Sequence, residues 1–245
     1  MGRGEDRGAG SRALRARGYP EHRPPRSDKC YLLFASWHYA FDERRTVSEP
    51  FYPLKGSRVL VPMMHQTELF GYCEGSDYQA VELPYRGRDE SPGPFSMVIL
   101  LPRPGRFLDF KRSLTRERLE RILGEFAPKN VALSLPKFRF QAKFRLREAL
   151  EALGMPLAFS IQADFSGMDG MRVLCIDNVI HEAFVAVDEG GTEAAAATAV
   201  VVKLTGMPGS PAVVVMKVDR PFLFLIREKE SGLILFLGRV THPTA

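Results

Sequence analysis

Residues 189–211 read Glu-Gly-Gly-Thr-Glu-Ala-Ala-Ala-Ala-Thr-Ala-Val-Val-Val-Lys-Leu-Thr-Gly-Met-Pro-Gly-Ser-Pro. This stretch connects an apolar run that ends near Val187 to another that starts near Val213. A connection of this length without regular structure is uncommon in a compact domain and is usually functional or disordered. Its first half contains only two charges, Glu189 and Glu193, in a graded run of Gly, Ala, Thr and Val. That composition is not typical of an ordinary linker.

If this run forms a strand, its side chains alternate between two faces. One face carries only small, uncharged residues: Thr192, Ala194, Ala196, Thr198 and Val200. The other face carries Glu193, Ala195, Ala197, Ala199 and Val201. A strand entering the middle of a sheet needs small, uncharged residues on its buried face, because the interior is close-packed and a buried charge is costly. Gly190 and Gly191 supply the backbone freedom to reverse and enter. Four consecutive alanines also favour a helix, so the spacing alone leaves strand, helix and surface loop open.

The chain on either side of this stretch has the pattern of strands, with apolar runs bounded by Gly, Pro and Asp. Strands are expected at 30–37, 58–64, 67–74, 78–85, 95–101, 130–140, 172–188, 212–217, 220–228 and 233–240. The last two form a hairpin with nearly continuous apolar strands, which predicts burial on both faces. Packing helices are expected at Thr115–Phe126, with Thr115 as the N-cap, and at Leu146–Leu153, with Gly154 as the stop. Because strands outnumber helices without regular βα alternation, the expected fold class is α+β with mixed and antiparallel sheets.

Charge and composition exclude several classes of function. Residues 1–28 contain seven Arg and four acidic residues, so they carry +3 of the formal +5 and leave only +2 for the other 217 residues. Residues 1–28 are expected to be a disordered Arg/Gly-rich tail, and the nearly neutral remainder predicts no nucleic-acid partner. No apolar run approaches the roughly 18–20 residues of a membrane helix, so no membrane partner is expected either. No GxSxG, P-loop, GxGxxG or HExxH pattern occurs, which predicts a protein that is not an enzyme and has no metal and no cofactor.

The deciding stretch resembles a known family. Val187-Asp-Glu-Gly-Gly-Thr-Glu-Ala-Ala-Ala-Ala-Thr-Ala is similar to the hinge of the reactive-centre loop of serpins, of a bacterial-like type. Arg220-Pro-Phe-Leu-Phe-Leu-Ile with Phe236-Leu-Gly-Arg-Val resembles the serpin C-terminal signature. Further matches, in colinear order, are Ala35-Ser-Trp37, Phe51-Tyr52, Val61-Pro-Met-Met64, Glu82-Leu-Pro-Tyr85, Met97-Val-Ile-Leu-Leu-Pro102, Leu135-Pro-Lys-Phe138, Leu153-Gly-Met155, Ala163-Asp-Phe-Ser166 and His181-Glu-Ala-Phe184. The resemblance covers about residues 30–243 and implies a serpin-like fold.

The resemblance also implies a mechanism. Serpins are suicide substrates of serine proteases and sometimes of cysteine proteases: the protease cleaves the loop, which then inserts into the central sheet and distorts the enzyme. It implies a loop hinge made of Glu189, Gly190, Gly191, Thr192, Glu193, Ala194, Ala195, Ala196, Ala197 and Thr198. Counting along the loop places the reactive site at Thr205 and Gly206, with Lys203, Leu204 and Met207 as alternatives. Lys203 suits a trypsin-like protease, whereas Thr205 or Leu204 suits an elastase- or subtilisin-like protease, which we rank higher.

Two single residues also match family positions. His181 resembles the shutter histidine beneath the opening sheet, and a core imidazole with satisfied hydrogen bonds is the ordinary alternative. Trp37 resembles the tryptophan at the top of the sheet where the loop enters, and the alternative is a lone core aromatic.

The sequence also departs from the family. The family's N-terminal helices and the strands that flank the insertion gap have no counterpart here, and Lys29-Cys30-Tyr31 replaces the usual Asn-Ala, so the shutter asparagine is missing. We therefore expect residues 29–245 to be a partial serpin domain with its reactive-centre loop at 189–211. The alternative functions are a non-inhibitory serpin-derived binding protein or a non-functional fragment. Localisation stays open: family members are often extracellular, but this N-terminus does not resemble a signal peptide.

Overall fold

The computed structural model describes residues 30–31, 35–170, 172, 174–192 and 212–243. The predicted disordered tail and loop residues 193–211 lie outside these ranges. The strands are β1 (Cys30–Tyr31), β2 (Ala35–Ser36), β3 (Val47–Phe51), β4 (Val59–Glu74), β5 (Tyr78–Arg86), β6 (Pro92–Pro102), β7 (Ala127–Pro136), β8 (Phe138–Arg145), β9 (Ile180–Val187), β10 (Gly191–Thr192), β11 (Val214–Lys217), β12 (Phe222–Glu228) and β13 (Ile234–Val240). The α-helices are α1 (Phe107–Ser113), α2 (Arg116–Gly124), α3 (Arg147–Ala152) and α4 (Ser166–Asp169). Two short 3₁₀ turns cover Glu43–Arg45 and Leu157–Phe159.

The larger sheet has the strand order β11-β7-β4-β5-β6-β12-β13, with β3 paired to β4. Its central strands are buried on both faces, which explains the unbroken apolar run of β6. On one face, Val98 and Leu100 pack with Phe110 of α1 and Ile122 of α2. The opposite face packs against the smaller sheet in the main hydrophobic core. The described residues therefore form three layers, with two helices, the larger sheet and the smaller sheet in that order.

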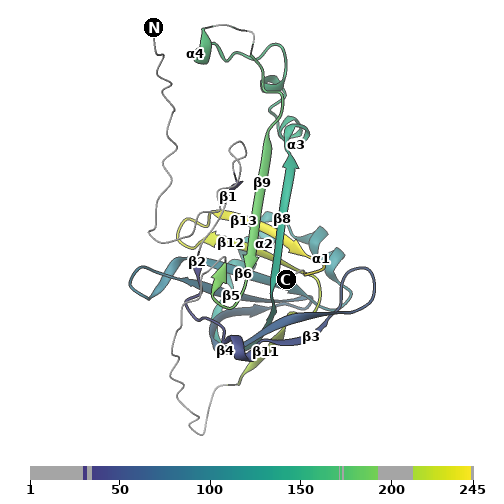
Figure 1. The fold of residues 1–245 in the computed structure, drawn as a ribbon, viewed down its shortest axis with the longest axis vertical. Coiled ribbons are helices and arrows are strands. Elements are labelled where there is room, and N and C mark those ends of the chain that lie inside the picture. Colours follow the sequence, from purple (N-terminus) through teal and green to yellow (C-terminus); the bar gives the residue numbers. More distant parts are fainter. Residues whose placement is uncertain (1–29, 32–34, 171, 173, 193–211, 244–245) are drawn as a thin grey trace, which may run out of the picture.

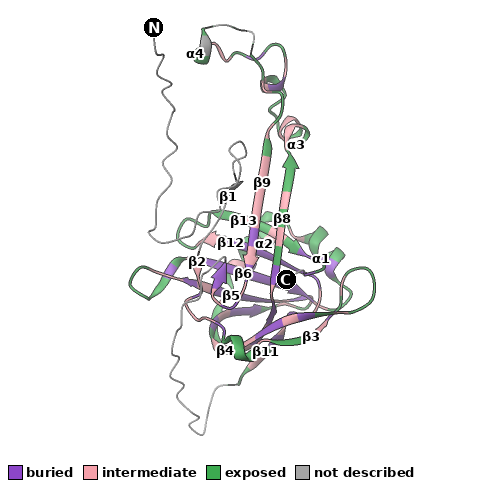
Figure 2. Ribbon diagram, viewed as in Figure 1, coloured by how far each residue is buried: buried purple, intermediate pink, exposed green. Residues whose placement is uncertain are grey.

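The smaller sheet has the order β1-β9-β10-β2, with β8 paired to β9. β8 and β9 form a long antiparallel pair that stands away from the larger sheet like a tower (Figure 1). Burial decreases along the tower, from Phe138 and Val187 at its base to the exposed Phe144 and Ile180 near its top (Figure 2). The base of the tower is therefore the part of the smaller sheet that the core holds in place.

The α+β fold class with mixed and antiparallel sheets is confirmed, but several element boundaries differ from the predictions. The runs at 58–64 and 67–74 form one strand, β4, because β7 pairs with it without a break from Met63 to Tyr72. On its other side, the two halves of β4 pair with β3 and β5. The predicted strand at 130–140 is two strands that break at Lys137, and among the described residues of the predicted strand at 172–188 only 180–187 pair. Helix α1 and strand β3 were missed. Thr115 caps α2 as expected, with its hydroxyl accepting a hydrogen bond from the Arg118 amide.

Two predictions about burial were wrong. Helix α3 has no buried residue and Leu153 is 81% exposed, so α3 is not a packing helix within the described residues. Only one strand of the C-terminal hairpin is buried on both faces. Strand β12 lies between β6 and β13 and is buried. Strand β13 is at the sheet edge and leaves Leu235 and Leu237 exposed, because α1 and α2 do not extend over it.

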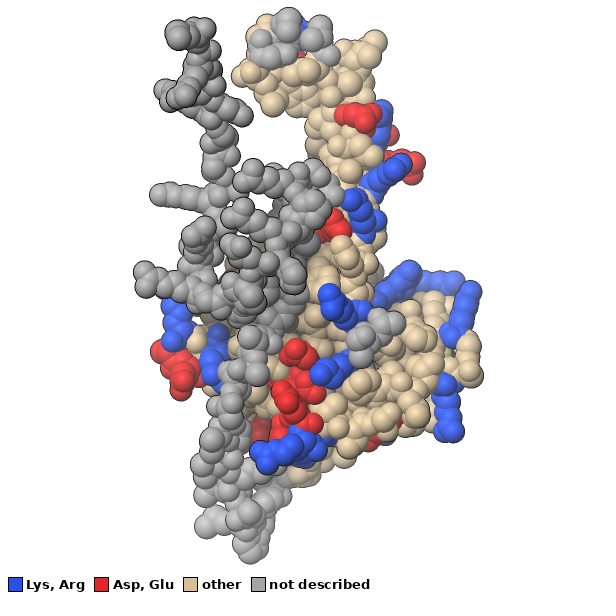
Figure 3. Space-filling view, in the orientation of Figure 1, with Lys and Arg blue, Asp and Glu red and all other residues tan. Residues whose placement is uncertain are grey.

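The described surface is mixed in charge. Figure 3 shows Lys and Arg side chains spread over the tower and the body, with Asp and Glu side chains among them. Among the described residues, no helix is long and apolar enough to cross a membrane. In the same part of the chain, no group of three His, Cys, Asp or Glu side chains is placed to hold a metal ion.

Candidate functional site

A tight turn at residues 188–191 starts the predicted hinge. The Asp188 carboxylate accepts hydrogen bonds from the amides of Gly190 (2.9 Å) and Gly191 (3.2 Å), and the Asp188 amide donates to the Gly191 carbonyl (3.0 Å). An Asp side chain that bonds its own backbone two residues ahead is typical of such turns. The sequence signal was present in Asp188 followed by Glu-Gly-Gly, but the role of this aspartate was not predicted.

Glu189 fixes this turn to two other parts of the molecule. Its carboxylate accepts hydrogen bonds from Thr46 Oγ1 (2.7 Å) and Lys137 Nζ (2.8 Å), and its carbonyl accepts one from the Phe41 amide (2.9 Å). Burial alone would raise the pKa of Glu189, but the hydrogen bonds from Lys137 and Thr46 outweigh it and lower the pKa below 4.5. Glu189 is therefore a charged anchor at neutral pH.

Trp37 holds the same turn from the smaller sheet. Its indole Nε1–H donates to the Asp188 carbonyl (2.9 Å), and its amide donates to the Gly190 carbonyl (2.9 Å). Its ring stacks on Tyr85, with centroids 4.8 Å apart and planes 6° from parallel. The sequence placed Trp37 at the top of the sheet where the loop enters, and here it directly contacts the turn that leads into the loop.

Thr192 is the first hinge residue with a fully buried side chain. Its hydroxyl lies 2.6 Å from the hydroxyl of Tyr85, and the residue is 2% exposed. Burial raises the pKa of Tyr85, so its hydroxyl stays protonated and available for this hydrogen bond. Thr192 is on the face of the run that the sequence predicts to be buried, and the other residues of the two predicted faces lie outside the described residues.

Strand β10 already lies between β2 and β9. Thr192 pairs with Ala35 on one side and with Val187 on the other, both antiparallel. The fit is close at Gly191, where a Cβ atom would lie 2.2 Å from the Ala35 carbonyl oxygen and 2.7 Å from Ser36 Cα. Only glycine fits this position without a shift of the backbone.

Farther from the base of the tower, β1 and β9 are direct neighbours. They pair in parallel, with Cys30 opposite Glu182 and Tyr31 opposite Ala183. Within the described residues, β10 therefore separates β2 from β9 at the base of the tower, and β1 pairs directly with β9 nearer its top.

His181 lies at the other end of β9, away from this cluster. It is half-buried, opposite Phe144 of β8, with ring centroids 6.3 Å apart. It is therefore not a core imidazole, and its shutter role stays a prediction. The remaining predicted site residues lie outside the described residues: Glu193, Ala194, Ala195, Ala196, Ala197, Thr198, Lys203, Leu204, Thr205, Gly206 and Met207.

The structure adds four residues to the predicted site, namely Asp188, Thr46, Tyr85 and Lys137. The last two lie in strings that matched the family, Glu82-Leu-Pro-Tyr85 and Leu135-Pro-Lys-Phe138, but their contacts with the hinge depend on tertiary structure. Nothing in the sequence around Thr46 distinguishes it from a surface threonine.

Comparison with known proteins identifies the family of this arrangement. Residues 31–243 match the family model described as "Serpin (serine protease inhibitor)". The chain belongs to the serpin family. A serpin-like protein of Thermococcus kodakarensis is 41% identical over 209 residues, which cover 85% of this chain and 47% of that protein. This serpin chain spans about half the length of the curated relatives it matches.

Solved serpin structures share the fold. Human thyroxine-binding globulin matches with a TM-score of 0.75 and 29% identity, covering 86% of this chain and 54% of that one. Mouse protein-Z dependent protease inhibitor matches with a TM-score of 0.72 and 29% identity, covering 88% of this chain and 54% of that one. The two neighbours differ in function by name, one a hormone-binding globulin and the other a protease inhibitor.

Proposed function

We propose that this serpin is a suicide-substrate inhibitor of serine proteases, in which cleavage of the loop at 189–211 lets its N-terminal part insert between β2 and β9. The observation that carries the proposal is strand β10: Gly191 and Thr192 already occupy the first positions of such an inserted strand. The hinge needs no rearrangement to start insertion, because its entry point is formed and occupied.

The pairing of β10 with β9 defines how insertion would continue. Thr192 lies opposite Val187, so an unbroken antiparallel register places residues 193–199 opposite residues 186–180 of β9. Ala194 would then lie on the inward face with Thr192, beside Val185, which is 2% exposed. About seven further backbone hydrogen bonds, each worth a net ~0.5–1.5 kcal/mol, give a driving force of about 4–10 kcal/mol.

Insertion must separate β1 from β9, which among the described residues pair at Cys30 and Tyr31 of β1. We infer that the cleaved hinge gains more pairing with β9 than β1 loses, so that the uncleaved chain is a metastable state held by the geometry of its loop. Insertion would carry a bound protease over a distance equal to the length of β9. This displacement far exceeds the roughly 1 Å of misplacement that an active site tolerates.

We propose Thr205–Gly206 as the scissile bond, with Lys203, Leu204 and Met207 as alternative bait residues, within a serpin domain formed by residues 29–245. An elastase- or subtilisin-like protease fits Thr205 or Leu204, a trypsin-like protease fits Lys203, and a cysteine protease is a further candidate target. The mouse neighbour named a protease inhibitor supports this class of partner.

Incubation with a panel of subtilisin-, elastase- and trypsin-like proteases tests the inhibitor proposal. The expected result is a covalent complex that survives SDS, together with a released C-terminal peptide whose first residue locates the cut between Lys203 and Met207. Cleavage at that position with full recovery of protease activity would contradict inhibition.

A non-inhibitory binding protein or a non-functional fragment is the second candidate. One observation favours it: a structural neighbour is a globulin named for thyroxine binding. This candidate predicts that the loop is cut as a plain substrate and that cleavage adds no stability.

A further inference from the structure

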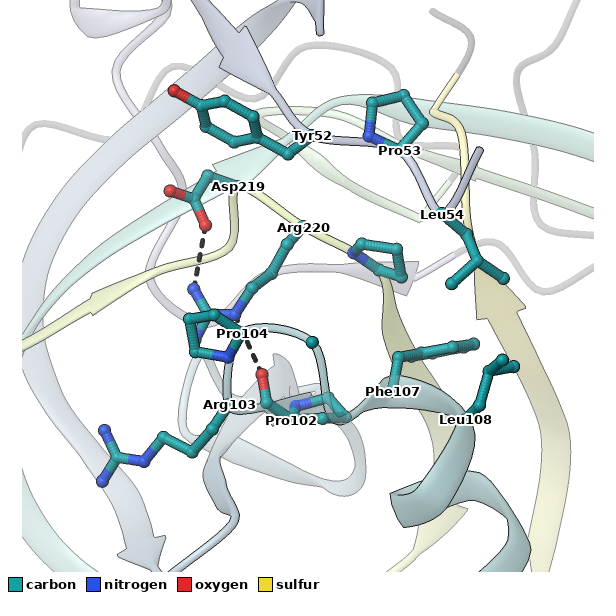
Figure 4. Close-up of a pocket in the computed structure, with 12 residues that line it drawn as sticks. Tyr52, Pro53, Leu54, Pro102, Arg103, Pro104, Phe107, Leu108, Asp219 and Arg220 are labelled. Atoms are coloured by element: carbon teal, nitrogen blue, oxygen red, sulfur yellow. Dashed lines mark hydrogen bonds and ion pairs between the residues drawn. The ribbon is translucent and has the colours of Figure 1, made fainter. Parts of the chain in front are cut away.

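The cavity drawn in Figure 4 offers no unpaired charge to a ligand. It has a volume of about 490 Å³ and lies between the segment after β3, the turn between β6 and α1, and the segment before β12. Both of its arginines form ion pairs, Arg220 with Asp219 at 2.9 Å and Arg103 with Glu74 at 3.3 Å. Its lining therefore does not select an anion.

A second cavity lies beside the entry point of the hinge and differs in charge. Its volume of about 370 Å³ falls within the range of about 300–1,000 Å³ that is typical of small-molecule sites. It is formed by β2, the end of β5 and the start of β6. Of its lining residues only Arg86 is charged, so the lining carries a formal charge of +1.

The protein does not neutralise the charge of Arg86. The Nε–H of its guanidinium is buried and has no acceptor in the described part of the chain. No carboxylate of the described residues forms an ion pair with it. The nearest acid along the sequence, Asp89, instead accepts a hydrogen bond from Ser91 Oγ (2.6 Å). Because buried N–H groups in native proteins nearly always have an acceptor, the unpaired donor identifies Arg86 as a group available to a ligand.

The other walls of this cavity are apolar and fixed to the core. Ala35 and Phe95 are half-buried, and both pack against the main hydrophobic core. Tyr85 is buried, and its ring stacks on Trp37. Walls that belong to the core are preformed, which lowers the entropic cost of binding.

Three residues that line the cavity also contact β10. Ser36 pairs with Gly191 and Ala35 pairs with Thr192, and the Tyr85 hydroxyl lies 2.6 Å from the Thr192 hydroxyl. A ligand that rests on Ala35 and Ser36 would therefore hold β2 in the position that pairs with β10.

We propose that this cavity binds a small organic carboxylate. The carboxylate accepts hydrogen bonds from the Arg86 guanidinium, whose planar fork matches it, and the apolar body lies against Ala35 and Phe95. A single guanidinium balances one negative charge, whereas a phosphate monoester would bring close to two. Binding stabilises β2 beside the hinge but does not depend on loop insertion, so this site goes beyond the proposed inhibitor function and can be tested without a protease.

Calorimetric titration of the full chain with 3-phenylpropionate tests the proposal. We expect saturable binding of one molecule per chain, and Arg86→Gln should weaken it at least tenfold. Arg88→Gln is the matched control, because Arg88 is an exposed arginine two residues further along and its loss changes the net charge equally. Equal affinities of the two variants, or no saturable binding to the parent chain, would overturn the proposal.

A charge series on the parent chain tests the role of Arg86 without any substitution. The neutral 3-phenylpropanol should bind at least tenfold more weakly than 3-phenylpropionate, and 3-phenylpropylammonium should show no saturable binding. If the three compounds bind equally, the apolar walls alone bind them and the assignment of Arg86 is wrong. Inorganic phosphate that binds more tightly than 3-phenylpropionate would contradict the choice of a carboxylate.

Hydrogen exchange tests the contact between the ligand and β2. Saturating 3-phenylpropionate should slow exchange at residues 191–192 at least threefold and leave residues 119–122 of α2 unchanged. Unchanged exchange at residues 191–192 in the saturated chain would contradict the placement of the ligand against Ala35 and Ser36.

Discussion

Glu189 accepts hydrogen bonds from Thr46 and Lys137, and these contacts make hinge stability depend on pH. Its pKa is lowered in the folded chain, so its contribution is complete above the unfolded value of about 4.5 and is lost as the pH falls through the folded value. We predict that Glu189→Gln lowers the free energy of unfolding by about 1–3 kcal/mol at pH 7. The difference from the parent chain should vanish below the folded pKa.

Melting curves between pH 3 and pH 7.5 check this prediction. Glu230→Gln is the matched control, because Glu230 is an exposed acid in the turn between β12 and β13. A difference between Glu189→Gln and the parent that stays constant down to pH 3 would show that the anchor does not depend on the charge of Glu189.

Gly191 is the residue at which the sheet admits no side chain. Its added Cβ would lie 2.2 Å from the Ala35 carbonyl oxygen, so we predict that Gly191→Ala forces β10 out of its position between β2 and β9. The overpacking should cost about 1–3 kcal/mol. Hydrogen exchange should become faster at residues 191–192, while Gly124→Ala, which meets no atom within 4 Å, should have no such effect. If residues 191–192 of Gly191→Ala stay as protected from hydrogen exchange as in the parent chain, the prediction is contradicted, because β10 would then keep its position between β2 and β9 despite the added side chain.

Sequence reasoning identified part of the candidate site. Local sequence strings identified Glu189, Gly191 and Thr192, because the hinge is one continuous segment of unusual composition. The string Ala35-Ser-Trp37 identified Trp37 in the same way. Tyr85 could not be assigned a role in the same way, since its contact with Thr192 joins residues 107 positions apart.

At the scale of the strand, substitutions on the inward and outward faces of the inserted hinge should have different effects. We predict that Ala194→Arg blocks insertion, because the side chain would enter the core beside Val185, and burying an unpaired charge costs several kcal/mol. Ala195→Arg, on the outward face, should preserve inhibition. A free-energy difference of ~1.4 kcal/mol corresponds to a tenfold change in an equilibrium constant. The number of serpin molecules consumed per inhibited protease should therefore rise at least about tenfold for Ala194→Arg and stay unchanged for Ala195→Arg. Equal values for the pair would contradict the predicted alternation.

The element boundaries show what a local pattern can predict. Strand β12 was correctly predicted, because it is central and its apolar run is unbroken. Helix α1 was missed, because only Phe107 and Phe110 face the core and seven residues give a weak periodic signal. The exposure of β13 depends on how far α1 and α2 extend over the sheet, which no local pattern contains.

At the scale of the whole molecule, the described residues leave an apolar strip at one sheet edge. Leu233, just before the edge strand β13, and Leu235 and Leu237 within it are 59%, 42% and 59% exposed. Contiguous exposed apolar surface predicts association. We expect concentration-dependent oligomers in sedimentation velocity, and the double variant Leu235→Lys/Leu237→Lys should weaken association at least about tenfold, given ~1.5–3 kcal/mol per buried leucine.

The control for this strip is a pair of apolar residues elsewhere that are more exposed than Leu235 and Leu237. Leu153 and Ile161 are 81% and 94% exposed near the top of the tower. Leu153→Lys/Ile161→Lys should leave the association constant unchanged. An equal effect of both double variants would assign association to general hydrophobicity rather than to β13.

The thermal stability of the chain before and after loop cleavage measures insertion most directly. A driving force of about 4–10 kcal/mol, at about 2–4 °C per kcal/mol for a chain of this size, predicts that Tm rises by roughly 8–40 °C after a cut between Lys203 and Met207. An unchanged or lower Tm in the cleaved chain would contradict insertion of the hinge between β2 and β9.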